Sequence, residues 1–214
     1  MPANDLEAEL LPILEHRRPP MTGAPPTCLG RECPKGFASL LAVANGFITK
    51  GRLFRVFGTD ADPLVPSLEA WNASEWKAAY GHVADVFIVA EDIFGDQYGY
   101  RFEPKRQLVK LWCEGGEGEA LEGGINWLIG AFFDPFGSGA LDEAILEAAL
   151  QRGLQPQANE HLAYTLPLVT GGDRTADNLS VESAALHLGT VSQLTRANRG
   201  HQDGSAISRF RSER

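Results

Sequence analysis

The sequence predicts an α+β fold, in which a twisted antiparallel sheet of about 4–6 strands is backed by helices. Two patterns favour it: short runs of β-branched and aromatic residues fill the middle of the chain, and helical patterns lie on either side of them. The 214 residues are 43% hydrophobic and 22% charged, which is enough apolar surface for a conventional core. We therefore expect one folded domain with short additions at its ends.

The first 35 residues are expected to form a helix and then a linker. The helix is assigned to residues 1–17 because four apolar side chains recur there at helical spacing: Leu6, Leu10, Ile13 and Leu14. Residues 19–34 are too rich in proline for a helix or a central strand. Residues 18–35 are therefore expected to be an extended linker.

Residues 36–195 are expected to form the α+β domain, which begins with a short buried helix. Asn45 and Gly46 should end that helix because both tolerate left-handed backbone angles. Short helices are expected around Leu68 and Trp71, and four runs have the composition of strands: residues 52–57, 83–90, 97–102 and 107–112. A turn at residues 103–105 is short enough to make the last two strands antiparallel neighbours.

The second half of this domain has a more helical character. Residues 126–136 are strongly apolar, and residues 140–152 combine good helix formers with Asp142 and Glu143 in the first turn. A strand at 161–169 and a helix at 181–195 are expected to complete the domain. The tail, residues 196–214, holds five arginines and few large apolar residues, so we expect it to stay unpacked.

The charge balance restricts the class of partner. The chain has 19 basic and 28 acidic residues, for a net charge of −9, which opposes direct contact with nucleic acid and favours a basic partner. Residues 1–195 alone hold 14 basic and 26 acidic residues, so their net charge is −12. The N-terminus has no signal-peptide pattern, and no run of apolar residues approaches membrane-spanning length. We expect a cytoplasmic protein without a membrane partner.

No catalytic or metal-binding signature is visible along the chain. Cys28 and Cys33 are spaced too widely for a zinc knuckle, and the five histidines never occur at i, i+4 spacing. The sequence therefore predicts no enzyme, no cofactor and no metal. The enzyme alternative would have to assemble distant residues such as His82, His161 and Asp173.

Acidic residues without basic neighbours are the feature that points to function. Residues 111–151 contain eight acidic residues and no Lys or Arg. With the acids that follow the strand at 83–90, they could form a docking rim for a basic protein around aromatic anchors. The candidate docking residues are Glu91, Asp92, Phe94, Asp96, Trp112, Glu114, Glu117, Glu119 and Glu122. The alternative is that these acids belong to separate solvated faces.

Several ordered motifs resemble those of the SUKH superfamily. Residues 39–47 read SLLAVANGF, residues 51–58 read GRLFRVFG, Trp71-Asn72 follows, and residues 86–100 read VFIVAEDIFGDQYGY. Residues 166–172, Asn178-Leu179 and His187-Leu188 are similar to the branch that contains immunity proteins against type VI secretion DNase effectors.

The resemblance implies a twisted antiparallel sheet backed by helices and a role as an immunity protein that neutralises a cognate toxin by direct contact. The toxin would be a basic protein. The family-motif residues with an implied structural role are Asn45, Gly46, Gly58, Gly95, Asp96, Gly171 and Gly172. A non-catalytic regulatory or scaffolding module is the alternative, because fold does not fix function. Oligomeric state, monomer or dimer, stays open.

Overall fold

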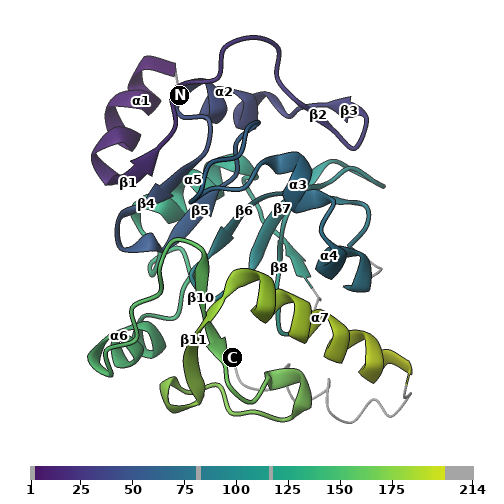
Figure 1. Cartoon of the computed structure of the whole chain (residues 1–214). Helices are drawn as coiled ribbons and strands as arrows, with labels where there is room; N and C mark the ends of the chain where they lie inside the picture. Colours follow the sequence, from purple (N-terminus) through teal and green to yellow (C-terminus); the bar gives the residue numbers. More distant parts are fainter. Residues whose placement is uncertain (1–2, 81–82, 116–117, 201–214) are drawn as a thin grey trace.

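A seven-stranded antiparallel sheet forms the centre of the molecule in the computed structural model, which describes residues 3–80, 83–115 and 118–200 (Figure 1). The strands, in their order across the sheet, are β1 (Leu14–Arg17), β4 (Phe47–Thr49), β5 (Phe54–Val56), β6 (Val86–Asp92), β7 (Gln97–Arg101), β8 (Gln107–Leu111) and β9 (Gly118–Ala120). The α+β class and the antiparallel sheet are thus confirmed, with one strand more than the upper expectation.

Two small hairpins lie outside this sheet. They are β2 (Thr27–Cys28) with β3 (Arg31–Glu32), and β10 (Glu160–Tyr164) with β11 (Leu179–Ser183). The α-helices are α1 (Ala3–Leu10), α2 (Lys35–Val43), α3 (Leu68–Asn72), α4 (Glu75–Tyr80), α5 (Ile125–Phe133), α6 (Glu143–Gln151) and α7 (Ala184–Gly200). Four single 3-10 turns connect them: η1 (Leu11–Ile13), η2 (Lys50–Arg52), η3 (Leu168–Thr170) and η4 (Ala176–Asn178).

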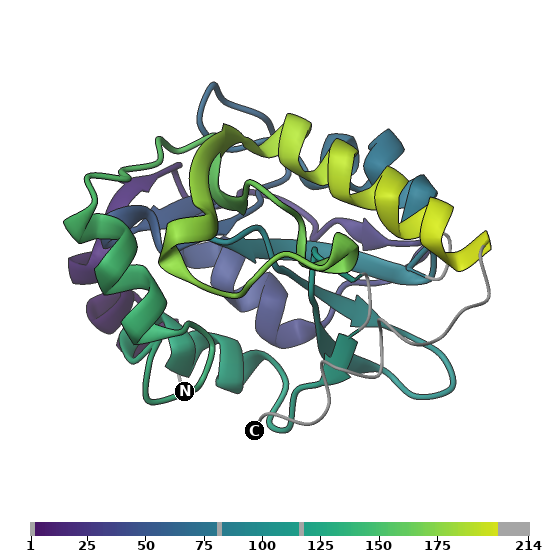
Figure 2. The same ribbon diagram turned by 90° about the horizontal axis from the view of Figure 1, so that it is seen from below.

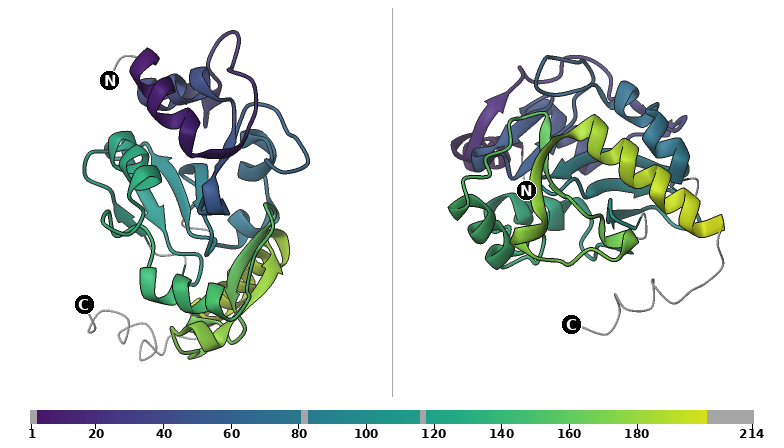
Figure 3. Two further views of the ribbon diagram at one scale, coloured as in Figure 1. Left: turned by 90° about the vertical axis from the view of Figure 1, so that its left-hand side faces the viewer. Right: turned by 60° about the horizontal axis from the view of Figure 1, so that its bottom comes forward.

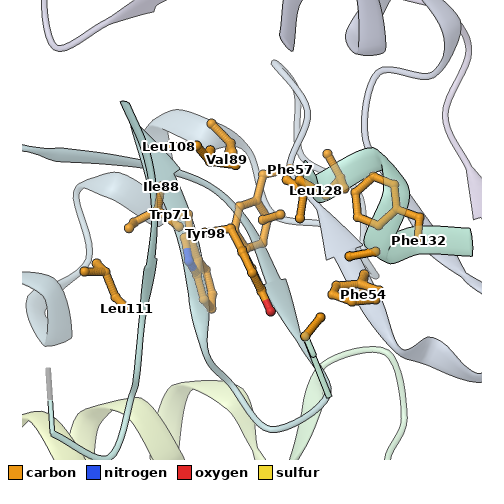
Figure 4. Close-up of a cluster of buried hydrophobic side chains, with 14 of the residues drawn as sticks. Phe54, Phe57, Trp71, Ile88, Val89, Tyr98, Leu108, Leu111, Leu128 and Phe132 are labelled. Atoms are coloured by element: carbon orange, nitrogen blue, oxygen red, sulfur yellow. The ribbon is translucent and has the colours of Figure 1, made fainter. Parts of the chain in front are cut away.

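Helices cover both faces of the sheet. Seen from below in Figure 2, α2 and α5 lie on one face, whereas α4 and α7 lie on the other. On the α5 face, the rings of Phe54 and Phe132 are 5.3 Å apart, and Figure 4 shows Phe132 projecting from α5 toward Phe54. On the other face, Phe57 packs on Trp71 of α3 at 4.8 Å between ring centroids. The sheet therefore separates two aromatic layers. Phe54 and Phe57, from the same segment of the chain, contribute one ring to each layer.

The helix predicted over residues 1–17 is wrong in its second half. The helix α1 ends at Leu10, a 3-10 turn containing Pro12 follows, and residues 14–17 form the edge strand β1. Proline removes a helical hydrogen bond and clashes with the preceding turn, so Ile13 ends the 3-10 turn and Leu14 begins the strand. Their spacing fits a helix, but the proline ends it.

Other boundaries differ in the same way, since tertiary pairing decides them. The expected linker 18–35 contains the β2–β3 hairpin, and its residue Met21 donates a backbone hydrogen bond to Leu41 in α2 at 2.9 Å. The expected strand at 161–169 ends at Tyr164, and the expected helix at 181–195 begins as β11 and becomes helical only at Ala184. The helix α7 then continues to Gly200, so residues 196–200 are helical, while the rest of the tail lies outside the described residues.

Candidate functional site

Three of the acids predicted to form a docking rim lie inside the protein. Glu91 is 1% exposed, Asp92 is 2% exposed and Glu114 is 8% exposed. Ionised carboxylates are buried only when cations and hydrogen-bond donors compensate the lost hydration. These residues therefore do not contribute to an acidic surface, and their partners define the candidate site.

Glu91 is held by a buried arginine on the neighbouring strand. Arg55 of β5 lies opposite Glu91 of β6, and its Nη2 donates a hydrogen bond to Glu91 Oε1. Arg55 also donates to the carbonyl of Ala158 at 2.6 Å, and Gln97 Nε2 donates to Glu91 Oε2 at 3.0 Å. Burial, the largest single effect, would raise the pKa of Glu91, but the charges of Arg55 and His161 and the hydrogen bond from Gln97 together outweigh it and lower that pKa to about 2.

Two histidines extend this pair into a polar chain. His161 Nε2 of β10 lies 3.3 Å from Glu91 Oε1, although the two atoms are poorly aligned for a hydrogen bond. His161 Nδ1 lies 3.1 Å from His187 Nδ1 of α7, and His187 Nε2 lies 3.4 Å from Glu114 Oε1. The Sγ atom of Cys113 is 4.0 Å from the same His187 Nε2. All five residues of this polar chain are buried, so bulk water does not reach it. They are Glu91, His161, His187, Glu114 and Cys113.

A glycine makes room for the two imidazoles. Gly95 occupies the turn between β6 and β7 at φ +86°, a conformation that side chains rarely adopt. A Cβ atom there would lie 2.7 Å from His161 Nδ1 and 3.1 Å from His187 Nδ1. The turn therefore needs glycine for its backbone angle and for the close approach of the histidine pair.

A second charged network lies on the α5 face of the sheet. Asp92 accepts a hydrogen bond from the Tyr98 hydroxyl at 3.0 Å, and Lys110 Nζ lies 3.6 Å from Asp92 and 3.0 Å from Asp96. Asp96 also accepts a bond from the backbone N–H of Cys113 at 3.0 Å. Burial, reinforced by the charge of Asp96, raises the pKa of Asp92 to about 7 in spite of Lys110. This network fastens the β6–β7 turn to β8.

The remaining predicted docking residues are divided between the interior and the surface. Phe94 and Trp112 are half-buried, and Trp112 lines a cavity of about 10 Å³ that admits no more than a water molecule. Glu119 in β9 and Glu122 after it are exposed. Glu117 lies outside the described residues. The structure therefore leaves Glu119 and Glu122 as the described members of the predicted rim that are exposed.

The family-motif residues lie at tight backbone positions. Asn45 Oδ1 accepts a hydrogen bond from the backbone N–H of Thr59 at 2.8 Å, and Gly46 has φ +93°. A Cβ atom at Gly58 would lie 2.2 Å from the Asn45 carbonyl oxygen. Gly171 ends η3 at φ +96°, and a Cβ at Gly172 would meet the Leu166 carbonyl oxygen at 1.9 Å. Each motif therefore has a backbone reason for its glycine.

The enzyme alternative does not gain a site from this arrangement. His161 is buried against His187 and Glu91, whereas Asp173 is exposed in the turn before β11. His82 lies outside the described residues. Of the three residues proposed for catalysis, His161 therefore lies in the interior and Asp173 lies at the surface.

Sequence reasoning missed Arg55, Cys113 and the role of His187. They come from β5, the end of β8 and α7, and nothing in their local sequence links them. The one available signal was composition, because Arg55 and Glu91 are charged residues within apolar strands. A charged residue in a central strand is buried, and it therefore needs a partner of opposite charge.

No family model matches the chain, and no curated protein matches it. The resemblance to the SUKH superfamily therefore stays a prediction. Among the described residues, no helix has both the length and the apolar character required to cross a membrane.

Proposed function

We propose that the protein is an immunity protein that neutralises a cognate secreted bacterial toxin by direct binding. The toxin would be a basic nuclease delivered by type VI secretion. The sequence motifs quoted above support this class of function, and the α+β sheet is of the kind that the resemblance implies.

The observation that carries the proposal is the acid-only segment at residues 111–151. Burial removes Glu114 from the predicted rim, yet five acids of the segment remain exposed: Glu119, Glu122, Asp134, Glu143 and Glu147. The segment itself contains no Lys or Arg, and Lys110, the basic residue just before it, is buried with Asp92 and Asp96. These exposed carboxylates are suited to a basic partner, whose nucleic-acid cleft would accept carboxylates in place of phosphates.

Co-expression tests the proposal directly. The protein would be produced in a naive bacterium together with the product of the adjacent open reading frame, and survival would be scored before the two proteins are co-purified. Rescue and a stable complex are expected. No rescue by this protein, and no complex, would favour the regulatory or scaffolding alternative.

A charge-reversal pair tests the surface itself. The double variant Glu119→Lys and Glu122→Lys should slow association by about ten-fold at low salt, because steering depends on charges near the docking site. Glu7→Lys and Glu9→Lys on α1 make the same change in net charge at exposed positions of another element. Association rates measured at two salt concentrations should fall strongly for the first variant only. If both double variants slowed association equally, residues 119–122 would not belong to the interface.

A further inference from the structure

Three metal-ligating side chains of different types meet at the end of β8. Cys113 and Glu114 follow that strand, and His187 projects from the first turns of α7. The sulfur of Cys113, a carboxylate oxygen of Glu114 and a ring nitrogen of His187 all lie within 4.8 Å of one another. All three residues are buried. The cluster combines thiol, imidazole and carboxylate, which is a ligand set that suits zinc.

The polar chain that reaches this cluster has one proton too few for its contacts. It runs Glu91, His161, His187, Glu114, and so contains three contacts between polar atoms. Two neutral imidazoles carry only two N–H groups between them. One contact must then bring two lone pairs together, unless a further cation enters the chain.

The tautomer of His161 decides where the missing positive charge lies. His161 Nε2 lies 3.3 Å from the Glu91 carboxylate, although without good hydrogen-bond alignment; if this nitrogen carries the N–H, which the negative charge of Glu91 favours, His161 presents a lone pair at Nδ1 and the missing charge lies at the Glu114 end. His187 Nδ1 then donates to His161 Nδ1, and the lone pair of His187 Nε2 faces the Glu114 carboxylate. The same His187 Nε2 lies 4.0 Å from the Cys113 sulfur.

We propose that Cys113 Sγ, Glu114 Oε1 and His187 Nε2 bind a Zn²⁺ ion. A tetrahedral zinc site places sulfur and nitrogen ligands about 3.6 Å apart, and nitrogen and oxygen ligands about 3.3 Å apart. The separations of 4.0 Å and 3.4 Å are close to those values, and the sulfur and the carboxylate oxygen lie within 4.8 Å of each other, so side-chain shifts would bring three of the four ligands of a tetrahedral site together. The other oxygen of Glu114 accepts a hydrogen bond from the Leu168 backbone N–H at 2.7 Å, which leaves Oε1 for the metal.

The surroundings have the form of an outer shell. A ligating histidine commonly donates its second N–H to a group that fixes its ring orientation. Here His161 receives that N–H, and Glu91, held by Arg55, fixes His161 in turn. The bound ion would connect α7 to the end of β8, and coordination would release the proton of the Cys113 thiol to solvent.

Cobalt spectroscopy on the untagged full chain tests the site. After chelator treatment, Co²⁺ should bind with one ion per chain and give a thiolate-to-cobalt charge-transfer band together with strong visible bands of tetrahedral Co²⁺. Added Zn²⁺ should remove both, and Zn²⁺ should raise the melting temperature of the metal-free protein. Cys113→Ser should abolish the charge-transfer band, and His187→Gln should weaken binding by at least about ten-fold.

Cys33→Ser is the matched control, because it removes a different buried thiol and should keep the full cobalt spectrum. Circular dichroism of each variant shows whether it folds. A wild-type chain that binds neither ion, or a charge-transfer band lost with Cys33→Ser and kept with Cys113→Ser, would overturn the proposal. In that case the missing charge is a proton shared by the two histidines. The metal-binding experiment does not involve the toxin. Its failure can therefore be distinguished from a failure of the proposed immunity function.

Discussion

At the scale of single residues, Arg55 and Glu91 form an ion pair that is buried in the protein interior. Arg55 is 6% exposed and Glu91 is 1% exposed. The guanidinium also donates to the carbonyls of Leu64 and Ala158, so it connects β5 to the loop before α3 and to the segment before β10. A buried ion pair contributes little net free energy of folding, but loss of one partner leaves the other uncompensated.

Replacing the cation of this pair should therefore destabilise the protein strongly. We expect Arg55→Met to reduce the free energy of unfolding by about 3–5 kcal/mol at pH 7, because the Glu91 carboxylate would remain buried without its partner. Arg31→Met is the control: Arg31 pairs with Glu103 at 2.5 Å, but both side chains are exposed, and such a pair is worth about 0–1 kcal/mol. Urea denaturation measures both values.

The acid dependence of this effect has a definite sign. The pKa of Glu91 is about 2 in the folded protein, below the ordinary value of 4.5, so its contribution is complete above the unfolded pKa and is lost as the pH falls toward 2. The difference between wild type and Arg55→Met should accordingly shrink in acid. A difference that stays constant from pH 7 to pH 3 would show that the lost packing of Arg55, and not the charge on Glu91, is responsible.

At the scale of elements, side chains and glycines fix how the helices join the sheet. Asn72 at the end of α3 accepts a hydrogen bond from the Ile88 backbone N–H and donates one to the Ile88 carbonyl, both at 2.8 Å. Its side chain thus pairs with β6 next to the register shift between Ile88 and Ala90. Just after β5, Gly58 packs directly on the backbone of Asn45, which follows α2.

Gly58→Ala should destabilise the junction between α2 and β5. The added Cβ would meet a backbone oxygen at 2.2 Å, and such overpacking costs about 1–3 kcal/mol. Gly130→Ala in α5 makes the same chemical change at an exposed position with open space, where alanine favours the helix by about 0.5–1 kcal/mol. The melting temperature should fall for the first variant and rise slightly for the second. A neutral Gly58→Ala would mean that the two backbones can separate without cost.

At the scale of the whole molecule, the C-terminal unit of β10, β11 and α7 closes over one face of the sheet. The right-hand view of Figure 3 shows α7 lying alongside α4, and the Leu162 backbone N–H in β10 donates to the Ile93 carbonyl at 2.9 Å. Leu188 and Val191 of α7 are almost fully buried. The candidate zinc ligands span this junction, so ion binding and attachment of the unit are coupled.

The unit should unfold together with the sheet. Leu188→Ala removes a fully buried side chain and should cost about 2–5 kcal/mol, whereas Leu186→Ala, two residues earlier and 60% exposed, should change stability by less than about 0.5 kcal/mol. Tryptophan fluorescence and far-ultraviolet circular dichroism should report one common transition for Leu188→Ala. Two separated transitions would show that the C-terminal unit opens independently.

Local patterns along the chain were sufficient for those elements whose stability is local. The strands β7 and β8 are joined by a short turn within the sequence, and α6 carries its own cap, since Asp142 accepts a hydrogen bond from the Ile145 backbone N–H at 3.1 Å. By contrast, β1 and β11 fall in segments that were expected to be wholly or partly helical. Their main-chain partners, β4 and β10, are separated from them by intervening segments, and their own composition resembles that of the adjoining helices.

The sequence by itself determined the α+β class, the antiparallel sheet, the glycine turns and the acid-only segment, because composition, periodicity and turn chemistry act over a few residues. Only the tertiary structure decided which acids are buried and which are exposed. Glu91 is paired with Arg55, 36 residues earlier, and Glu114 meets His187, 73 residues later. Whether a carboxylate faces water or a buried cation depends on such distant partners, and a linear pattern of charges does not contain them.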